Sequence, residues 1–89
     1  DFYTIRMYIM IERYISVFDN KTELLIKKIV ITLDLSLLKK KYREELNTDP
    51  LLYYEYEIKK DDVEFYKKFI DIDFEFDKYS YFLSCSEVK

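Results

Sequence analysis

The stretch IRMYIMIERYISVF, residues 5–18, decides the fold, because apolar and polar side chains alternate along it. A period of two with many β-branched residues is typical of a β-strand that has one buried face. Residues 19–22, DNKT, follow with turn chemistry, since Asp and Asn side chains bond to nearby backbone groups. Residues 23–32, ELLIKKIVIT, favour a second strand, so the sequence predicts an antiparallel hairpin. Arg13 interrupts the apolar row and is expected at a bulge or at the rim of the sheet.

Two amphipathic segments are expected to form helices after the hairpin. Residues 34–46, DLSLLKKKYREEL, carry apolar side chains at helical spacing, and either Asp34 or Ser36 can cap the first turn. The lysines and the arginine of this segment are expected on its solvated side. Residues 61–70, DDVEFYKKFI, predict a shorter helix with acidic residues in its first turn and lysines in its last, as the helix dipole prefers.

The remaining segments complete an α+β fold. Residues 51–58 favour either a short strand or an extended connection, and residues 79–86, YSYFLSCS, alternate again and predict a third strand. The expected order is β-β-α-(β)-α-β, an antiparallel sheet of three to four strands with two helices packed on one face. The chain of 89 residues is expected to form one domain, residues 1–89.

The composition excludes several classes of function. Without His the chain has no Ser-His-Asp triad and no imidazole ligand for a metal, and without Gly it has no phosphate-binding loop. The single cysteine, Cys85, lies in an apolar run and is expected to be a buried, unreactive thiol in a reducing compartment. No apolar stretch is long enough to span a bilayer. We therefore expect a cytoplasmic protein that is no enzyme, binds no cofactor and does not enter a membrane.

Charge is segregated along the chain. Residues 1–43 carry a net charge of +4, residues 44–77 carry −8 and residues 78–89 carry +1. The densest stretch, DIDFEFD at residues 71–77, would place four carboxylates on one side and three apolar groups on the other if it were extended. Glu55 and Glu57 repeat this pattern beside two tyrosines. Two interpretations are open: a solvated face that maintains solubility, or a surface shaped for a basic partner.

Other uses of these carboxylates are disfavoured. A calcium loop beginning at Asp71 needs Gly at its sixth position and Glu at its twelfth, where Phe76 and Phe82 stand, so no metal site is expected. Paired carboxylates can perform acid-base catalysis, but a chain this short is a poor host for the deep pocket required. Direct nucleic-acid binding is not expected, because the net charge is −3 and the second half is strongly acidic.

Four segments resemble a known family. They are FDNKTEL at residues 18–24, ITLDLSLL at 31–38, YYEYEIKKDDVEFYKKF at 53–69 and FEFDKYSYFLSC at 74–85. Together they resemble small bacterial immunity proteins of contact-dependent growth-inhibition and polymorphic-toxin systems. The resemblance implies that the protein binds the toxic domain of an effector and blocks it in the cytoplasm. Many such toxins are nucleases, whose active sites are basic because they hold phosphates.

The resemblance supplies no binding residues, so they are assigned from charge and aromatic content. The expected toxin-binding residues are Tyr54, Glu55, Tyr56, Glu57, Asp61, Asp62, Glu64, Asp71, Asp73, Glu75 and Asp77. For Tyr54 and Tyr56, packing in the core is the alternative to binding the toxin. The alternative function is a generic protein–protein interaction module, or a homodimeric structural subunit formed through the exposed edge of the first strand.

Overall fold

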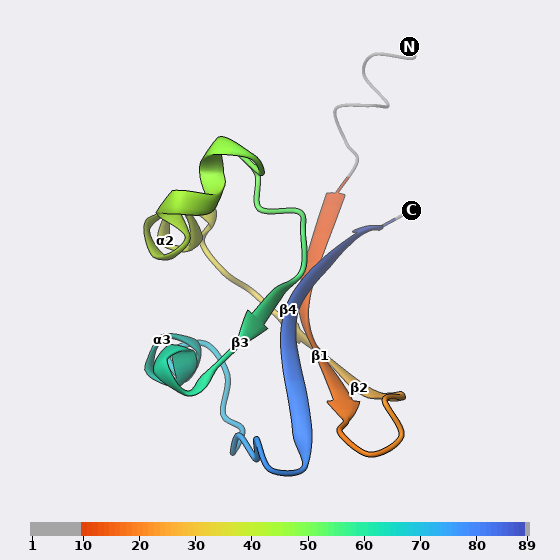
Figure 1. The fold of residues 1–89 in the computed structure, drawn as a ribbon. Coiled ribbons are helices and arrows are strands. Elements are labelled where there is room, and N and C mark those ends of the chain that lie inside the picture. The colour runs from red at the N-terminus through yellow and green to blue at the C-terminus, as the bar shows by residue number, and fades with distance from the viewer. Residues whose placement is uncertain (1–9, 89) are drawn as a thin grey trace.

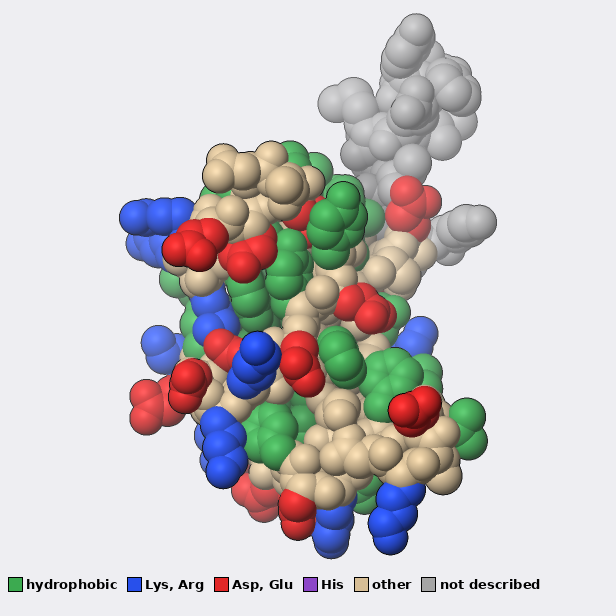
Figure 2. Space-filling model, viewed as in Figure 1, with side chains coloured by type: hydrophobic (Ala, Val, Ile, Leu, Met, Phe, Trp, Pro, Cys, Tyr) green, Lys and Arg blue, Asp and Glu red, His purple; other side chains and the backbone are tan. Residues whose placement is uncertain are grey.

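Four antiparallel strands form one sheet in the order β2-β1-β4-β3 in the computed structural model, which describes residues 10–88 (Figure 1 and Figure 2). The strands are β1 (Met10–Asp19), β2 (Leu25–Ile31), β3 (Tyr56–Ile58) and β4 (Tyr79–Val88). The helices are α2 (Leu35–Lys41) and α3 (Val63–Tyr66), and two 3-10 helices are η1 (Arg43–Asn47) and η2 (Lys60–Asp62). Figure 1 shows both α-helices on the same side of the sheet. The predicted α+β architecture is confirmed, while residues 5–9 of the predicted first strand lie outside the described residues.

The predicted hairpin is confirmed, and its second strand is shorter than expected, Leu25–Ile31 in place of residues 23–32. Strand β1 pairs antiparallel with β2, and the Asp19 carboxylate accepts the N–H groups of Lys21 at 2.7 Å and of Thr22 at 3.0 Å. These bonds hold the pKa of Asp19 below its ordinary value. Glu23 adopts a φ of 62°, in the left-handed region. Because that residue still belongs to the turn, β2 begins at Leu25 and not at residue 23.

Arg13 lies at the rim of the hairpin and not at a bulge. It pairs with Ile31, the last residue of β2, and its guanidinium donates to the carbonyl of Leu51 at 2.6 Å. The register irregularity between β1 and β2 instead falls between Val17 and Phe18. The hydrogen bond to Leu51 explains why a charged side chain is tolerated in the apolar row.

Strand β1 is internal, because it pairs with β2 on one side and with β4 along its whole length on the other. Strand β4 is also internal, between β1 and β3. The edges of the sheet are therefore β2 and β3, and the homodimer expected through the edge of the first strand has no free edge over residues 13–18. The segment at residues 51–58 resolves into the short edge strand β3.

The first helix is correctly placed but ends earlier than predicted. Asp34 caps it, its carboxylate accepting the N–H of Ser36 at 2.9 Å. The α-helix ends at Lys41, because Tyr42 leaves helical geometry with φ −106° and ψ 40°, and η1 continues to Asn47. The predicted helix 34–46 therefore breaks at the residue whose ring is buried in the core, Tyr42.

The second predicted helix, residues 61–70, is also shorter than expected. One 3-10 turn, η2, leads into the four-residue α3, and single hydrogen-bonded turns continue to Ile70. Tyr66 is fully buried, as its predicted inward position requires. The hydroxyl groups of Tyr42 and Tyr66 lie 2.5 Å apart and join the two helical regions above the sheet.

One apolar core lies between the sheet and the helices. Its sheet side consists of Ile15 and Val17 from β1, Ile31 from β2, Ile58 from β3, and Tyr81 and Leu83 from β4, all of them buried. Leu38, Tyr42, Leu52 and Tyr66 close it from the helical side. Because successive strand residues point to opposite faces, the residues between these core positions must face away from the helices.

Candidate functional site

The open face of the sheet is the face that carries no helix in the described part of the chain. Its residues follow from the register, since directly paired positions share a face: Ser16 pairs with Lys28 and Phe82, and Phe82 pairs with Glu57. The open face consists of Glu12, Tyr14, Ser16, Phe18, Leu25, Lys28, Val30, Glu55, Glu57, Ser80, Phe82, Ser84 and Ser86. It combines aromatic rings, small hydroxyls and two of the predicted carboxylates.

A chain of hydrogen bonds places Glu55 on the open face. Ser16 and Ser84 are both buried, and their hydroxyl oxygens lie 3.0 Å apart. The Ser84 hydroxyl donates to the Glu55 carboxylate at 3.3 Å, so Ser16 can donate to Ser84 in turn. These hydrogen bonds orient the exposed carboxylate of Glu55 over the middle of β4.

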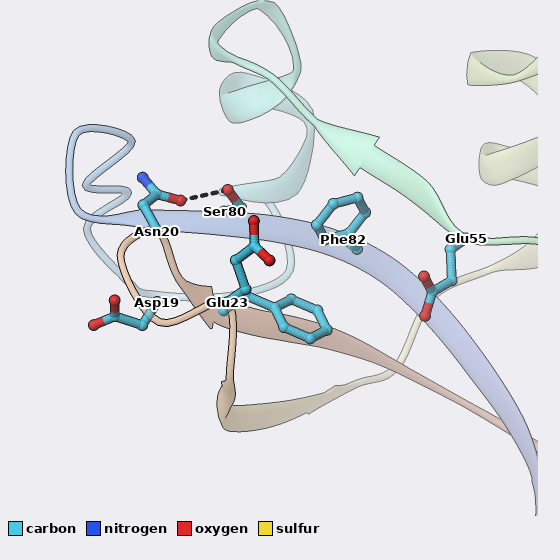
Figure 3. Close-up of a pocket in the computed structure, with 7 residues that line it drawn as sticks. Asp19, Asn20, Glu23, Glu55, Ser80 and Phe82 are labelled. Atoms are coloured by element: carbon cyan, nitrogen blue, oxygen red, sulfur yellow. Dashed lines mark hydrogen bonds between the residues drawn. The ribbon is translucent and has the colours of Figure 1, made fainter.

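A shallow depression of about 320 Å³ opens on this face, between the hairpin turn and β4 (Figure 3). Its floor is aromatic: the rings of Phe18 and Phe82 meet edge to face, 5.6 Å apart. Figure 3 shows Phe82 between the side chains of Glu23 and Glu55. The lining residues are Phe18, Asp19, Asn20, Glu23, Glu55, Ser80 and Phe82, which include three carboxylates and no Lys or Arg.

The turn end of the depression is fixed by polar contacts. The Ser80 hydroxyl donates to the Asn20 side-chain oxygen at 2.5 Å (Figure 3), and the Asn20 amide donates to the carbonyl of Phe76 at 3.1 Å. The Asp19 carboxylate is engaged by the turn N–H groups, and in Figure 3 it points away from Phe82. Glu23 and Glu55 are therefore the two carboxylates directed at the depression.

Asp49 anchors the segment that carries Glu55. Its carboxylate accepts the N–H groups of Tyr53 at 2.8 Å and Tyr54 at 2.9 Å and the hydroxyl of Tyr56 at 2.6 Å. Burial raises the pKa of Asp49, but the hydrogen bond from Tyr56 and those from the two N–H groups outweigh it, so the pKa lies below its ordinary value. Burial, followed by the bond to Asp49, raises the pKa of Tyr56.

The acidic segment at residues 71–77 alternates as predicted, but it lies on the other side of the molecule. Its four carboxylates are exposed, and Ile72, Phe74 and Phe76 are half-buried against the core. The ring of Phe74 lies 4.8 Å from the core ring of Tyr81. The segment thus covers the helical face of the sheet, so Asp71, Asp73, Glu75 and Asp77 are not brought together with Glu55 and Glu57 on the open face.

The carboxylates of the second helical region also lie on the helical side. Asp61 and Glu64 are exposed on η2 and α3. Asp62 instead forms an ion pair with Lys41 at 2.6 Å and accepts the N–H of Lys59 at 2.8 Å. Burial raises the pKa of Asp62, yet the bonds from Lys41 and Lys59 outweigh it and lower the net pKa. Asp62 is thus occupied in linking α3 to α2, and Lys41 is not the solvated side chain that its position predicted.

The two tyrosines assigned to the site differ in their surroundings. Tyr54 is 62% exposed and free to contact a partner. Tyr56 is half-buried, its ring 4.8 Å from that of Tyr42 and its hydroxyl bonded to Asp49. Tyr56 therefore packs against the core, which is the alternative interpretation of this tyrosine.

The charge-based assignment missed Phe18, Glu23 and Phe82, which line the depression. The alternation along β4 could have identified Phe82, because Phe82 is the one aromatic residue among the serines of this strand that face away from the core. Glu23 lies next to a turn, so only the closure of the hairpin brings it near β4.

The structure adds three observations on chemistry. Over residues 10–88, no three His, Cys, Asp or Glu side chains are grouped in a way that could hold a metal ion. None of the described helices is long and apolar enough to cross a membrane. Cys85 is half-buried, burial raises the pKa of its thiol, and the thiol donates to the carbonyl of Tyr53 at 3.2 Å.

A family model described as "Domain of unknown function (DUF7683)" matches residues 12–84. The chain belongs to this family. The DUF7683 match contains all seven residues of the depression and most of β1 and β4. No curated protein and no solved structure matches the chain.

Proposed function

We propose that this DUF7683 domain is an immunity protein, which binds a toxic protein domain by placing its open face on a basic surface of that toxin. The observation that supports the proposal is the aromatic depression on the sheet face that carries no helix within residues 10–88, with Glu23 and Glu55 directed at it. The role is binding and not catalysis, and the encounter takes place in the cytoplasm.

The physical argument rests on complementarity. A nuclease holds phosphates with cationic side chains, and carboxylates can take the place of those phosphates. Opposite potentials accelerate association and exclude wrong partners. Aromatic side chains near the centre of an interface supply much of the binding energy, and Phe18 and Phe82 line the depression on the open face.

The test compares two double charge reversals of equal size. Glu23→Lys with Glu55→Lys changes the depression, while Asp71→Lys with Asp73→Lys changes exposed carboxylates on the helical side. Association and dissociation rates are measured with the toxin domain encoded next to the gene for this chain, and growth protection is scored on coexpression. Circular dichroism establishes that both variants remain folded.

We expect the depression variant to lose protection and to bind at least roughly 100-fold more weakly, since reversing charges that face a partner costs several kcal/mol. The helical-side control is expected to slow association only a few-fold through long-range attraction, an effect that salt removes. Equal losses in both variants would show that only overall charge matters and that the contact site is wrong. Unchanged binding in both would contradict the acidic-surface mechanism.

A further inference from the structure

The outer edge of β2 is unpaired in the described part of the chain. Strand β2 stands at the end of the order β2-β1-β4-β3, and β1 is its one partner there. In an antiparallel edge strand, alternate residues direct their N–H and C=O groups outward, where another strand can bind them. At seven residues, β2 is the longer of the two edges, since β3 has three.

The side chains of this edge are apolar at its ends and cationic at its middle. Leu25, Ile26 and Val30 are 45%, 52% and 60% exposed. Lys27 and Lys28 between them are exposed as well. Neither lysine takes part in the ion pairs found over residues 10–88, and Lys28 has the ring of Tyr14 as its neighbour, with its ammonium 4.6 Å from the ring centroid.

The charges decide which strand could bind. A second copy pairing antiparallel through the middle of β2 would place Lys28 opposite its own counterpart and Lys27 close by. Like charges directly opposite each other destabilise a β-ladder. In that register the edge is unsuited to a homodimer, and a strand with carboxylates at its middle meets opposite charges instead.

We propose that the β2 edge binds, by strand addition, an extended segment of a different polypeptide that carries two adjacent carboxylates flanked by apolar residues. The carboxylates must be adjacent because successive strand residues point to opposite faces, so Lys27 and Lys28 present their charges on the two faces of the sheet. The flanking apolar residues pack against Leu25, Ile26 and Val30. This partner is acidic, unlike the basic toxin proposed for the open face, and it binds the backbone edge of β2, not the depression lined by Phe18, Glu23, Glu55 and Phe82.

Lysines on an edge strand also have a simpler role, which is to discourage aggregation. That role predicts weak pairing with any strand and no preference for an acidic one. The two roles are separated by measuring whether the sign of the charge on a peptide controls its binding to β2.

The probe is a blocked eight-residue peptide, Ser-Val-Ile-Glu-Glu-Ile-Val-Ser, and its control has two lysines in place of the glutamates. Each is titrated into the isotopically labelled full chain and followed by amide NMR shifts and by hydrogen exchange. We expect the acidic peptide to shift β2 amides, to slow their exchange, and to bind at least roughly ten-fold more tightly than the lysine peptide, from two charged cross-strand pairs.

The variant Lys27→Glu with Lys28→Glu supplies a reciprocal test. Both positions are exposed, so the fold is expected to persist, and the peptide preference should reverse in favour of the lysine peptide. Equal binding of both peptides, shifts that map outside β2, or a preference that fails to reverse would overturn the proposal. A stable homodimer of the unaltered chain that pairs through β2 would overturn it too.

Discussion

Replacing Asp49 by asparagine tests the contact that holds the segment bearing Glu55. Asp49 is 5% exposed, and its two carboxylate oxygens accept three donors: the N–H groups of Tyr53 and Tyr54 and the Tyr56 hydroxyl. Asparagine has the same shape but one acceptor oxygen and one NH₂ group. Whichever way the amide is turned, at least one backbone N–H faces another donor.

The cost follows from this count of donors and acceptors. A buried donor left without a partner costs about 1–3 kcal/mol. The bonds that persist lose their charge assistance, which makes them roughly half as strong. We therefore expect Asp49→Asn to lower the free energy of unfolding at pH 7 by about 2–4 kcal/mol, a large part of the roughly 5–15 kcal/mol of a typical domain.

The effect of pH has a definite sign. Burial alone raises the pKa of Asp49, but its hydrogen bonds lower the folded-state pKa below the ordinary value of 3.8. The associated stabilisation is therefore present above that value and is lost as the pH falls through the lower folded-state pKa. The difference between the unaltered protein and the Asp49→Asn variant should shrink on acidification below about pH 4.

Urea unfolding followed by far-ultraviolet circular dichroism measures both effects, because the chain has no tryptophan to report by fluorescence. Asp71→Asn is the matched control, since Asp71 is exposed, and surface substitutions of this kind change stability by at most about 0.5 kcal/mol. An Asp49→Asn variant as stable at pH 7 as the control would refute the reasoning.

Three further outcomes concern the buried tyrosine hydroxyls and the half-buried thiol of Cys85. Tyr66→Phe leaves the Tyr42 hydroxyl without its partner and should cost about 1–2 kcal/mol in urea unfolding, whereas the additional change Tyr42→Phe should recover part of it; simple additivity of the two losses would count against a coupled pair. Burial raises the pKa of Tyr42 to about 12, so spectrophotometric titration should show fewer ionised tyrosines at pH 11 in the native protein than in urea. Burial also raises the pKa of the Cys85 thiol, so its alkylation by iodoacetamide should be several-fold slower in the native than in the unfolded protein, and equal rates would contradict this.

Local patterns along the chain predict the elements of this fold well. The alternation at residues 5–18, the turn chemistry at Asp19 and the cap at Asp34 all act between neighbours in sequence, so they can be recognised without the structure. The lengths of the helices could not be predicted in this way. The α-helical geometry is lost at Tyr42, whose ring contacts Tyr56 and whose hydroxyl meets Tyr66, and both contacts join residues far apart in the chain.

The order of the strands could not be predicted from local sequence patterns either. Hydrophobic alternation predicts that β4 is a strand, but not that it lies between β1 and β3. The insertion of β4 beside β1 removes the free edge of the first strand and brings Phe82 next to Phe18. The aromatic floor of the depression therefore depends on a pairing across some sixty residues, which no local pattern contains.

The two acidic stretches illustrate why charge density along a chain does not define a surface. In both, alternate residues face the core: Tyr56 between Glu55 and Glu57, and Ile72, Phe74 and Phe76 between the carboxylates of residues 71–77. The first stretch belongs to the sheet, whose outward direction is the open face, while the second covers the core from the helical side, where the outward direction is opposite. Identical patterns thus point their charges in opposite directions, and the −8 of residues 44–77 is divided between two surfaces. A partner that binds one face meets only a part of that charge, which is why the paired reversals at Glu55 and at Asp73 are the measurement that assigns the interface.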